Sequence, residues 1–205
     1  MTDRMMLFID YQNVYRGARE CFHPEADAPS IAGQISPILL GEHIVATSPF
    51  DRELAGVHIY RGRPDATRDP RGNAACARQV EAWTRDPRAT VIARPLRYPR
   101  GWPHRCQPGE KPQEKGIDAA LVADFVQLAW EDQYDVGVLM STDTDLKPAL
   151  EKVAARAGKR VEVAAWRGEG RYNQRLSIDS ARLWCHWLDR KVYEQVSDTT
   201  NYSRP

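Results

Sequence analysis

Residues 135–166 read DVGVLMSTDTDLKPALEKVAARAGKRVEVAAW, and this stretch decides the fold. Its two apolar runs, 135–141 and 160–166, have the length of buried strands. Between them, residues 146–157 predict a helix that ends at Gly158. Apolar strands joined through a helix are typical of a parallel sheet that is covered by helices on both faces. The stretch therefore predicts an α/β fold.

The same alternation continues through the rest of the chain. Further strands are predicted at 5–10, 54–61 and 90–96, and further helices at 73–83 and 117–130, while residues 11–20 form either the start of a helix or a wide turn. We therefore predict one three-layer α/β domain over residues 1–196, with a central, mainly parallel sheet of about five strands. A last helix at about 180–195 is expected to close the sheet with Trp184 and Trp187 in the core, and residues 197–205 are expected to form a flexible tail.

The composition excludes several classes of protein. Hydrophobic residues make up 42% of the chain and the formal net charge is +1, which favours a globular protein over a disordered one. The apolar runs are far shorter than the roughly 18 to 20 residues of a membrane-spanning helix, so we expect no membrane segment. The N-terminus lacks the apolar core of a signal peptide, which predicts a cytoplasmic protein whose four cysteines are thiols.

The small net charge conceals an uneven distribution. The net charge is −4 over residues 1–60, +7 over 61–115 and −2 over 116–205. In the basic segment, four arginines lie directly after predicted strands and are expected at the rim where those strands end: Arg61, Arg63, Arg97 and Arg100. They would bind the phosphates of a polyanion, while Tyr98 and Trp102 of the proline-rich loop 98–112 would stack on bases. A solvated charged surface is the alternative for these arginines.

Carboxylates follow two of the predicted strands. Asp10 ends the first strand, and Asp143 and Asp145 follow the strand at 135–141. In α/β sheets the functional crevice lies beyond the carboxyl ends of the strands, so these acids should share one rim, with Asp118 in the first turn of a nearby helix. Converging carboxylates repel one another unless cations offset the charge, and hard oxygen ligands favour Mg²⁺ or Mn²⁺. The pattern indicates hydrolytic phosphoryl transfer, and helix capping is the alternative for each acid taken alone.

Three segments, 8–15 (FIDYQNVY), 115–124 (KGIDAALVAD) and 141–146 (STDTDL), resemble the three signatures of the NYN domain, in the LabA-like branch of the PIN-like nucleases. Their order and spacing agree over roughly residues 5–166. The resemblance implies a PIN-like fold and metal-dependent ribonuclease activity. It also implies that the metal is held by Asp10, Asp118 and Asp143, with Asp145 as a fourth carboxylate.

Other residues of these motifs receive roles from the same resemblance. Asn13 would position Asp10 or a metal-bound water, and Lys115 would face the substrate phosphate, although a solvated loop lysine is the alternative. Thr142 and Leu146 stand where the family usually has a glycine and an aromatic residue. The Thr142 side chain would either crowd the site or hydrogen-bond the ligand. Asp124 points about 240° around the helix from Asp118, so a structural role is equally consistent.

The leading hypothesis is an endoribonuclease that uses Mg²⁺ or Mn²⁺ to cleave single-stranded or structured RNA. An RNA-binding or regulatory module with little or no nuclease activity is the main alternative. A small-molecule phosphohydrolase is the third, which the expected open basic rim disfavours. The sequence leaves a homodimer open.

Overall fold

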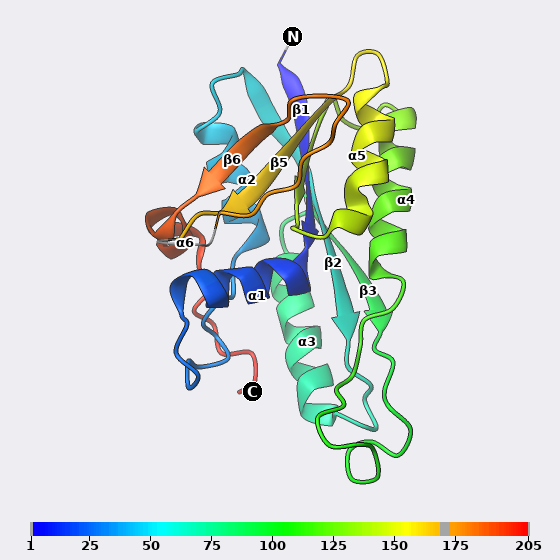
Figure 1. Ribbon diagram of the computed structural model, residues 1–205. Helices are drawn as coiled ribbons and strands as arrows, with labels where there is room; N and C mark the ends of the chain where they lie inside the picture. The colour runs from blue at the N-terminus through cyan, green and yellow to red at the C-terminus, as the bar shows by residue number, and fades with distance from the viewer. Residues whose placement is uncertain (1, 169–172, 205) are drawn as a thin grey trace.

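The computed structural model describes residues 2–168 and 173–204, which form an α/β domain (Figure 1). Six strands make one sheet in the order β3-β2-β1-β4-β5-β6, and every neighbouring pair is parallel. The strands are β1 (Asp3–Asp10), β2 (Arg52–Arg63), β3 (Ala89–Pro95), β4 (Val136–Met140), β5 (Arg160–Trp166) and β6 (Trp184–Leu188). The predicted fold class is confirmed, with six strands where about five were expected.

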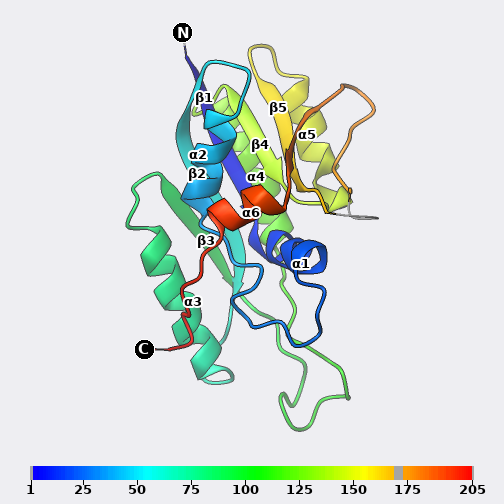
Figure 2. The ribbon, with the colours of Figure 1, turned by 90° about the vertical axis from the view of Figure 1, so that its left-hand side faces the viewer.

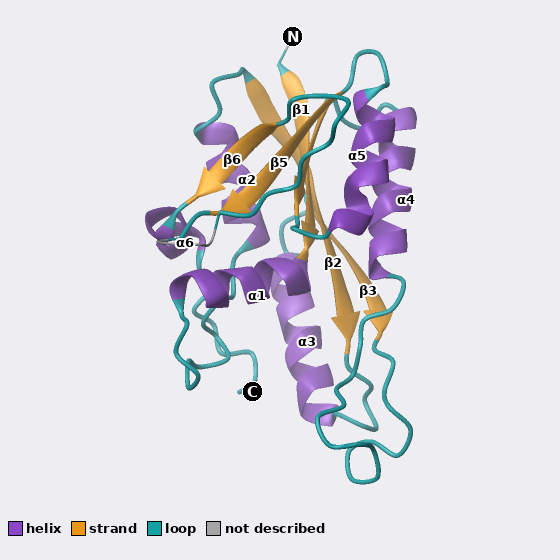
Figure 3. Cartoon of the chain, in the orientation of Figure 1, coloured by secondary structure: helices purple, strands orange, loops and turns teal. Residues whose placement is uncertain are grey.

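Helices cover both faces of the sheet (Figures 2 and 3). One face packs against α1 (Tyr11–Phe22), α2 (Pro37–Ala46), α3 (Pro70–Trp83) and α6 (Arg190–Val196). The other face packs against α4 (Ile117–Trp130) and α5 (Lys147–Ala154). A short 3-10 turn at Thr144–Leu146 precedes α5. Because side chains alternate along a strand, Met5, Leu7 and Ile9 of β1 enter the first core while Met6 and Phe8 enter the second.

The helix predicted at 180–195 is wrong over its first half. Residues Trp184–Leu188 form β6, which pairs in parallel with β5, and the helix is only Arg190–Val196. Trp184 is 49% exposed and Trp187 is 37% exposed, so neither tryptophan is a core residue as predicted. Their spacing of three residues suits a helix face, but on an edge strand it places the two indoles on opposite faces of the sheet.

Helix α2 was not predicted, although its start carries a recognisable signal. Ser36 caps the helix, with its hydroxyl accepting from the Leu39 backbone N–H, and Pro37 occupies the first turn. Leu40 and Ile44 are fully buried against the sheet. The helix fills the connection between β1 and β2 and covers the same face of the sheet as α1.

The segment after α6 lies against the domain. The Asp198 N–H donates to the Gln34 carbonyl at 3.1 Å, and Arg78 Nε donates to the Tyr202 carbonyl at 2.8 Å. The sequence predicts a flexible tail at 197–205, whereas the described residues 197–204 are joined by these bonds to the loop before α2 and to α3.

Two smaller predictions concern the membrane and the cysteines. Among the described residues, no helix is both long enough and apolar enough to cross a membrane. All four cysteines are free thiols, as predicted.

Candidate active site

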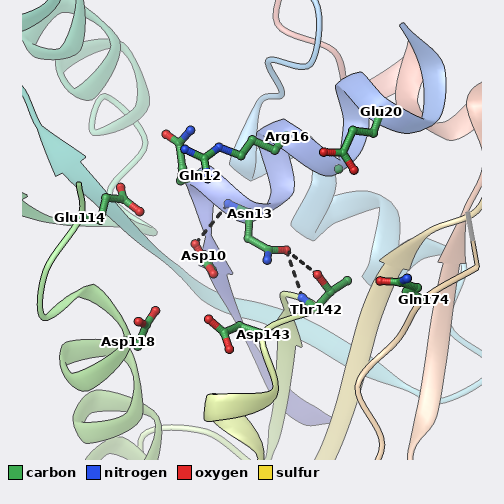
Figure 4. A pocket seen from close by; sticks show the side chains of 11 residues that line it. Asp10, Gln12, Asn13, Arg16, Glu20, Glu114, Asp118, Thr142, Asp143 and Gln174 are labelled. Carbon is green, nitrogen blue, oxygen red and sulfur yellow. Dashed lines mark hydrogen bonds between the residues drawn. The ribbon is translucent and has the colours of Figure 1, made fainter. Parts of the chain in front are cut away.

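The predicted acids lie at the carboxyl ends of the central strands. β1 and β4 are neighbours, with Ile9 opposite Met140, so the residues that follow them meet at one rim. The strand order reverses direction here, since β2 and β3 lie on one side of β1 and β4 to β6 on the other. A cavity of about 670 Å³ opens at this point, and Asp10, Asp118 and Asp143 all line it (Figure 4). The structure thus brings together three of the four predicted acids.

Asp10 is the most buried of these acids, with 5% of its surface exposed. It caps α1 by accepting from the Asn13 N–H at 3.3 Å, and its second oxygen accepts from the Ser141 hydroxyl at 3.0 Å. Burial raises its pKa to about 6, repulsion from Glu114 and Asp118 adds to this rise, and the two hydrogen bonds oppose it. Asp10 therefore both caps α1 and lines the cavity.

Asp143 and Asp118 face the same cavity from other elements. Asp143 accepts from the Asp145 N–H at 2.9 Å and so caps the 3-10 turn, while its own N–H donates to Ser141 Oγ at 3.1 Å. Asp118 lies in the first turn of α4, after Gly116 in the left-handed conformation. Burial raises the pKa of Asp118, and repulsion from Asp143 and Asp145 adds to the rise.

Asn13 and Thr142 connect the two strand ends. Asn13 Oδ1 accepts from the Thr142 N–H at 3.0 Å and from the Thr142 hydroxyl at 3.2 Å. Because the amide oxygen takes both bonds, the amide nitrogen is the Asn13 group that remains to face the cavity (Figure 4). The Thr142 hydroxyl is thus engaged with Asn13, and it holds the loop after β4 against the start of α1.

Glu114 is a cavity residue that sequence reasoning missed. Its carboxylate accepts from the Gly62 N–H, and burial raises its pKa. A Cβ at Gly62 would lie 2.3 Å from Leu96 Cδ2 and 2.8 Å from Glu114 Oε1, so a side chain there would displace both of these side chains. The available signal was its position directly before the motif at 115–124, but its contact lies 52 residues away along the chain.

Arg16 was also missed, and its position on α1 was the available signal. It follows Gln12 by four residues, so the two share a face of the helix that lines the cavity, together with Glu20. Among the described residues, five carboxylates line the cavity, Asp10, Glu20, Glu114, Asp118 and Asp143, together with one basic side chain, Arg16.

The four predicted arginines lie outside this wall. Arg61 donates to Gln79, and its guanidinium lies over the rings of Tyr11 and Trp83. Arg63, Arg97 and Arg100 are exposed, as are Lys115 and Asp145, and none of these lines the cavity. The expectation that these arginines share the acidic rim is therefore not met, because strand alternation turns Arg61 toward α3 and the others extend into solvent.

Two further predictions concern single side chains. Asp124 has a structural partner, since the Tyr60 hydroxyl donates to it at 2.9 Å. Trp102 lines a hollow beside the acidic cavity, and Gln12, Arg16 and Glu114 border both. Tyr98 instead receives the Asp65 N–H at 3.1 Å, with Arg68 over its ring.

The acidic groups on the cavity wall are all carboxylates, and carboxylate oxygens are the ligands that hard divalent cations prefer. In the described part of the chain, no Lys or Arg forms an ion pair with Asp10, Asp118 or Asp143. Within that same part, no three His, Cys, Asp or Glu side chains are grouped closely enough to form a ready metal centre. The acids thus line one cavity with unbalanced charge and without converging on a single point.

Comparisons with known proteins bear on this site. The NYN domain matches residues 4–179. No curated protein matches the chain in sequence. A solved structure of a protein of unknown function from Vibrio parahaemolyticus is similar with a TM-score of 0.57 and 20% identity, covering 92% of this chain and 94% of that one. That likeness shows the fold alone.

Proposed function

The chain belongs to the NYN domain family, and on that premise we propose that it is a metal-dependent endoribonuclease, a hydrolase that cleaves RNA phosphodiester bonds at the acidic cavity. The observation that carries this proposal is the set of five carboxylates around one cavity, to which the described residues contribute one arginine. Burial raises the pKa of Asp10, Glu114 and Asp118, and repulsion from neighbouring acids adds to each rise, whereas the charges of Arg16 and Arg61 oppose it at Glu114.

We assign the metal-holding role to Asp10, Asp118 and Asp143, with Asp145 as an outer carboxylate. When bound, Mg²⁺ or Mn²⁺ would supply Lewis-acid stabilisation of the phosphate and activation of the attacking water. The protein fixes its own ligands in advance, because Ser141 holds Asp10 and the 3-10 turn holds Asp143. Asn13 orients the site through its amide nitrogen, and Arg16 contacts a phosphate at the cavity wall.

RNA as the substrate is supported by the surface that continues from the cavity. The neighbouring hollow carries Trp102 as a stacking surface, and Arg16 and Lys111 supply positive charge there beside Glu110 and Glu114. Lys115, Arg63, Arg97 and Arg100 are exposed and would contribute outer phosphate contacts. An open, basic approach of this kind favours a polymer over a small phosphorylated molecule.

The cytoplasmic location and the homodimer stay predictions.

A second candidate is an RNA-binding module of the same family with little or no nuclease activity. One observation favours it: among the residues described, no acidic triad is grouped as a ready metal centre.

The test is cleavage of labelled single-stranded RNA in the presence of Mn²⁺. We expect cleavage by the wild type, none with a chelator, and a loss of about 100-fold or more for Asp143→Asn. Asp27→Asn is the matched control, because Asp27 is exposed and far from the cavity wall, and it should cleave like the wild type. Cleavage that survives both the chelator and Asp143→Asn would overturn the proposal. Binding without turnover would select the RNA-binding module.

A further inference from the structure

A further hollow, separate from the one that Trp102 lines, lies beside the acidic cavity and has a volume of about 180 Å³. Gln12 borders both, so the two are separated by the first turn of α1. Tyr11 and Tyr15 share one stripe of that helix and form an aromatic wall, with their rings stacked at 6.4 Å between centroids. The hollow therefore lies next to the place where the backbone of a bound RNA would be cut.

Its wall contains a buried polar network. Gln79 is 6% exposed and Gln34 is 9% exposed. Gln79 Nε2 donates to the Tyr11 hydroxyl oxygen at 3.0 Å and to Gln34 Oε1 at 2.9 Å, while Gln79 Oε1 accepts from Arg61. Each polar atom of the Gln79 amide is thus satisfied, and the amide of Gln34 is held with its nitrogen outermost.

Among the described residues, three donors of this network have no acceptor. Within the described residues, Gln34 Nε2 makes no hydrogen bond, the Tyr11 hydroxyl proton has no acceptor, and Arg61 Nε is buried without a partner. Burial raises the pKa of Tyr11, so its hydroxyl keeps its proton at neutral pH. Gln34 and Tyr11 both line the hollow, so a ligand that brings acceptors there would pair with their free donors.

The geometry of Arg61 gives the hollow a rigid floor. Its guanidinium carbon lies 5.1 Å from the Tyr11 ring centroid and 5.5 Å from that of Trp83. On the remaining side, residues 201–203 complete the wall, and Arg78 holds them through the Tyr202 carbonyl. The donors are therefore fixed in place before a ligand arrives.

We propose that this hollow is a base-recognition pocket that receives one nucleotide base beside the scissile phosphate and prefers a base with carbonyl acceptors, uracil or guanine. The proposal rests on RNA being the ligand of the acidic cavity. Sequence-specific recognition of RNA uses splayed-out bases that stack on aromatic or guanidinium planes and hydrogen-bond along their edges. The hollow offers both features, and its volume, small beside the acidic cavity, suits one planar base rather than a length of chain.

The experiment measures binding in a chelator, so that no cleavage is needed. Fluorescent oligoadenylates that differ only in one central nucleotide are titrated against the wild type. We expect the oligonucleotide with central uracil or guanine to bind about 5-fold tighter than those with adenine or cytosine. Comparison of the uracil and guanine oligonucleotides shows which of the two bases is preferred.

Two variants connect the preference to the hollow. Gln34→Met removes the free donor and should bring the affinity ratio to about 1, whereas the exposed Gln133→Met should keep the wild-type ratio. Gln34→Glu replaces that donor with an acceptor and should abolish the preference for uracil over adenine and cytosine, whose amino groups donate.

Equal affinities for all four oligonucleotides in the wild type would overturn the proposal, because phosphate contacts alone are indifferent to the base. A base preference that persists in folded Gln34→Met and Gln34→Glu would overturn it as well. Cleavage without base preference refutes only the pocket, whereas base preference without cleavage refutes only the nuclease.

Discussion

Asp10 and Glu162 are buried carboxylates of the same sheet, with 5% and 0% of their surface exposed, yet their partners differ in kind. Glu162 of β5 receives Arg52 through two bonds of 2.8 and 3.0 Å and His186 at 2.7 Å. Asp10 receives a hydroxyl and a backbone N–H but no cation.

The pKa values of the two carboxyl groups follow from this difference. Burial alone would raise the pKa of Glu162, but the hydrogen bonds and charges of His186 and Arg52 outweigh it and lower the pKa to about 2. The pKa of Asp10 rises to about 6. A buried acid that the protein has paired is structural, and a buried acid left unpaired in a cavity indicates a site for an external cation.

The largest effect is expected when the ion pair between Arg52 and Glu162 is broken. Arg52→Met leaves Glu162 charged and buried, so we expect the free energy of unfolding at pH 7 to fall by about 3–5 kcal/mol. The loss should shrink as the pH falls toward about 2, where Glu162 takes up a proton. Urea denaturation measures this. The exposed Arg85→Met should change stability by less than about 0.5 kcal/mol, and an equally small effect of Arg52→Met would show that the pair is dispensable.

The second effect concerns Asp10, the acid without a cationic partner, and here a substitution is expected to raise the stability of the protein. Because folding raises the pKa of Asp10 from 3.8 to about 6, the folded state binds the proton more strongly, and the stability from this group is lost as the pH rises through that range. In a chelator, Asp10→Asn should therefore stabilise the protein at pH 7, by up to roughly 3 kcal/mol, and leave it unchanged below about pH 4. Denaturation at the two pH values tests this, and destabilisation at pH 7 would contradict it.

The smallest effect is expected from the hydrogen bond between the Thr142 hydroxyl and Asn13. Thr142→Val keeps the shape of the side chain but removes its hydroxyl bond to Asn13, which should cost about 1 kcal/mol of stability and lower RNA cleavage by about 5-fold. Thr144→Val is the control, because Thr144 is exposed in the adjacent turn. A gain in cleavage by Thr142→Val would mean that the hydroxyl hinders the site.

The sequence predicted the central strands and their acids because both depend on local pattern. The apolar runs at β1 and β4 are continuous and the run at β5 is interrupted only by Glu162, and parallel strands bring Asp10 and Asp143 to one rim without further information. β6 was missed because an edge strand with exposed tryptophans lacks that continuous pattern.

Side-chain direction and distant contacts account for the rest. The position of Arg61 after an apolar run did not show that its side chain turns toward Trp83. Glu114 enters the cavity wall through a contact with Gly62 that no local pattern encodes. Tertiary packing, and not propensity, decides both.

The docking of the C-terminal residues also gives the molecule a chemical reporter. Cys76 of α3 is 3% exposed and lines the same hollow as Asn201, Tyr202 and Ser203. Its reactivity toward an alkylating reagent should therefore follow the release of those residues from the domain. Labelling of this one thiol, read by peptide mass, would count how often the wall of the hollow opens.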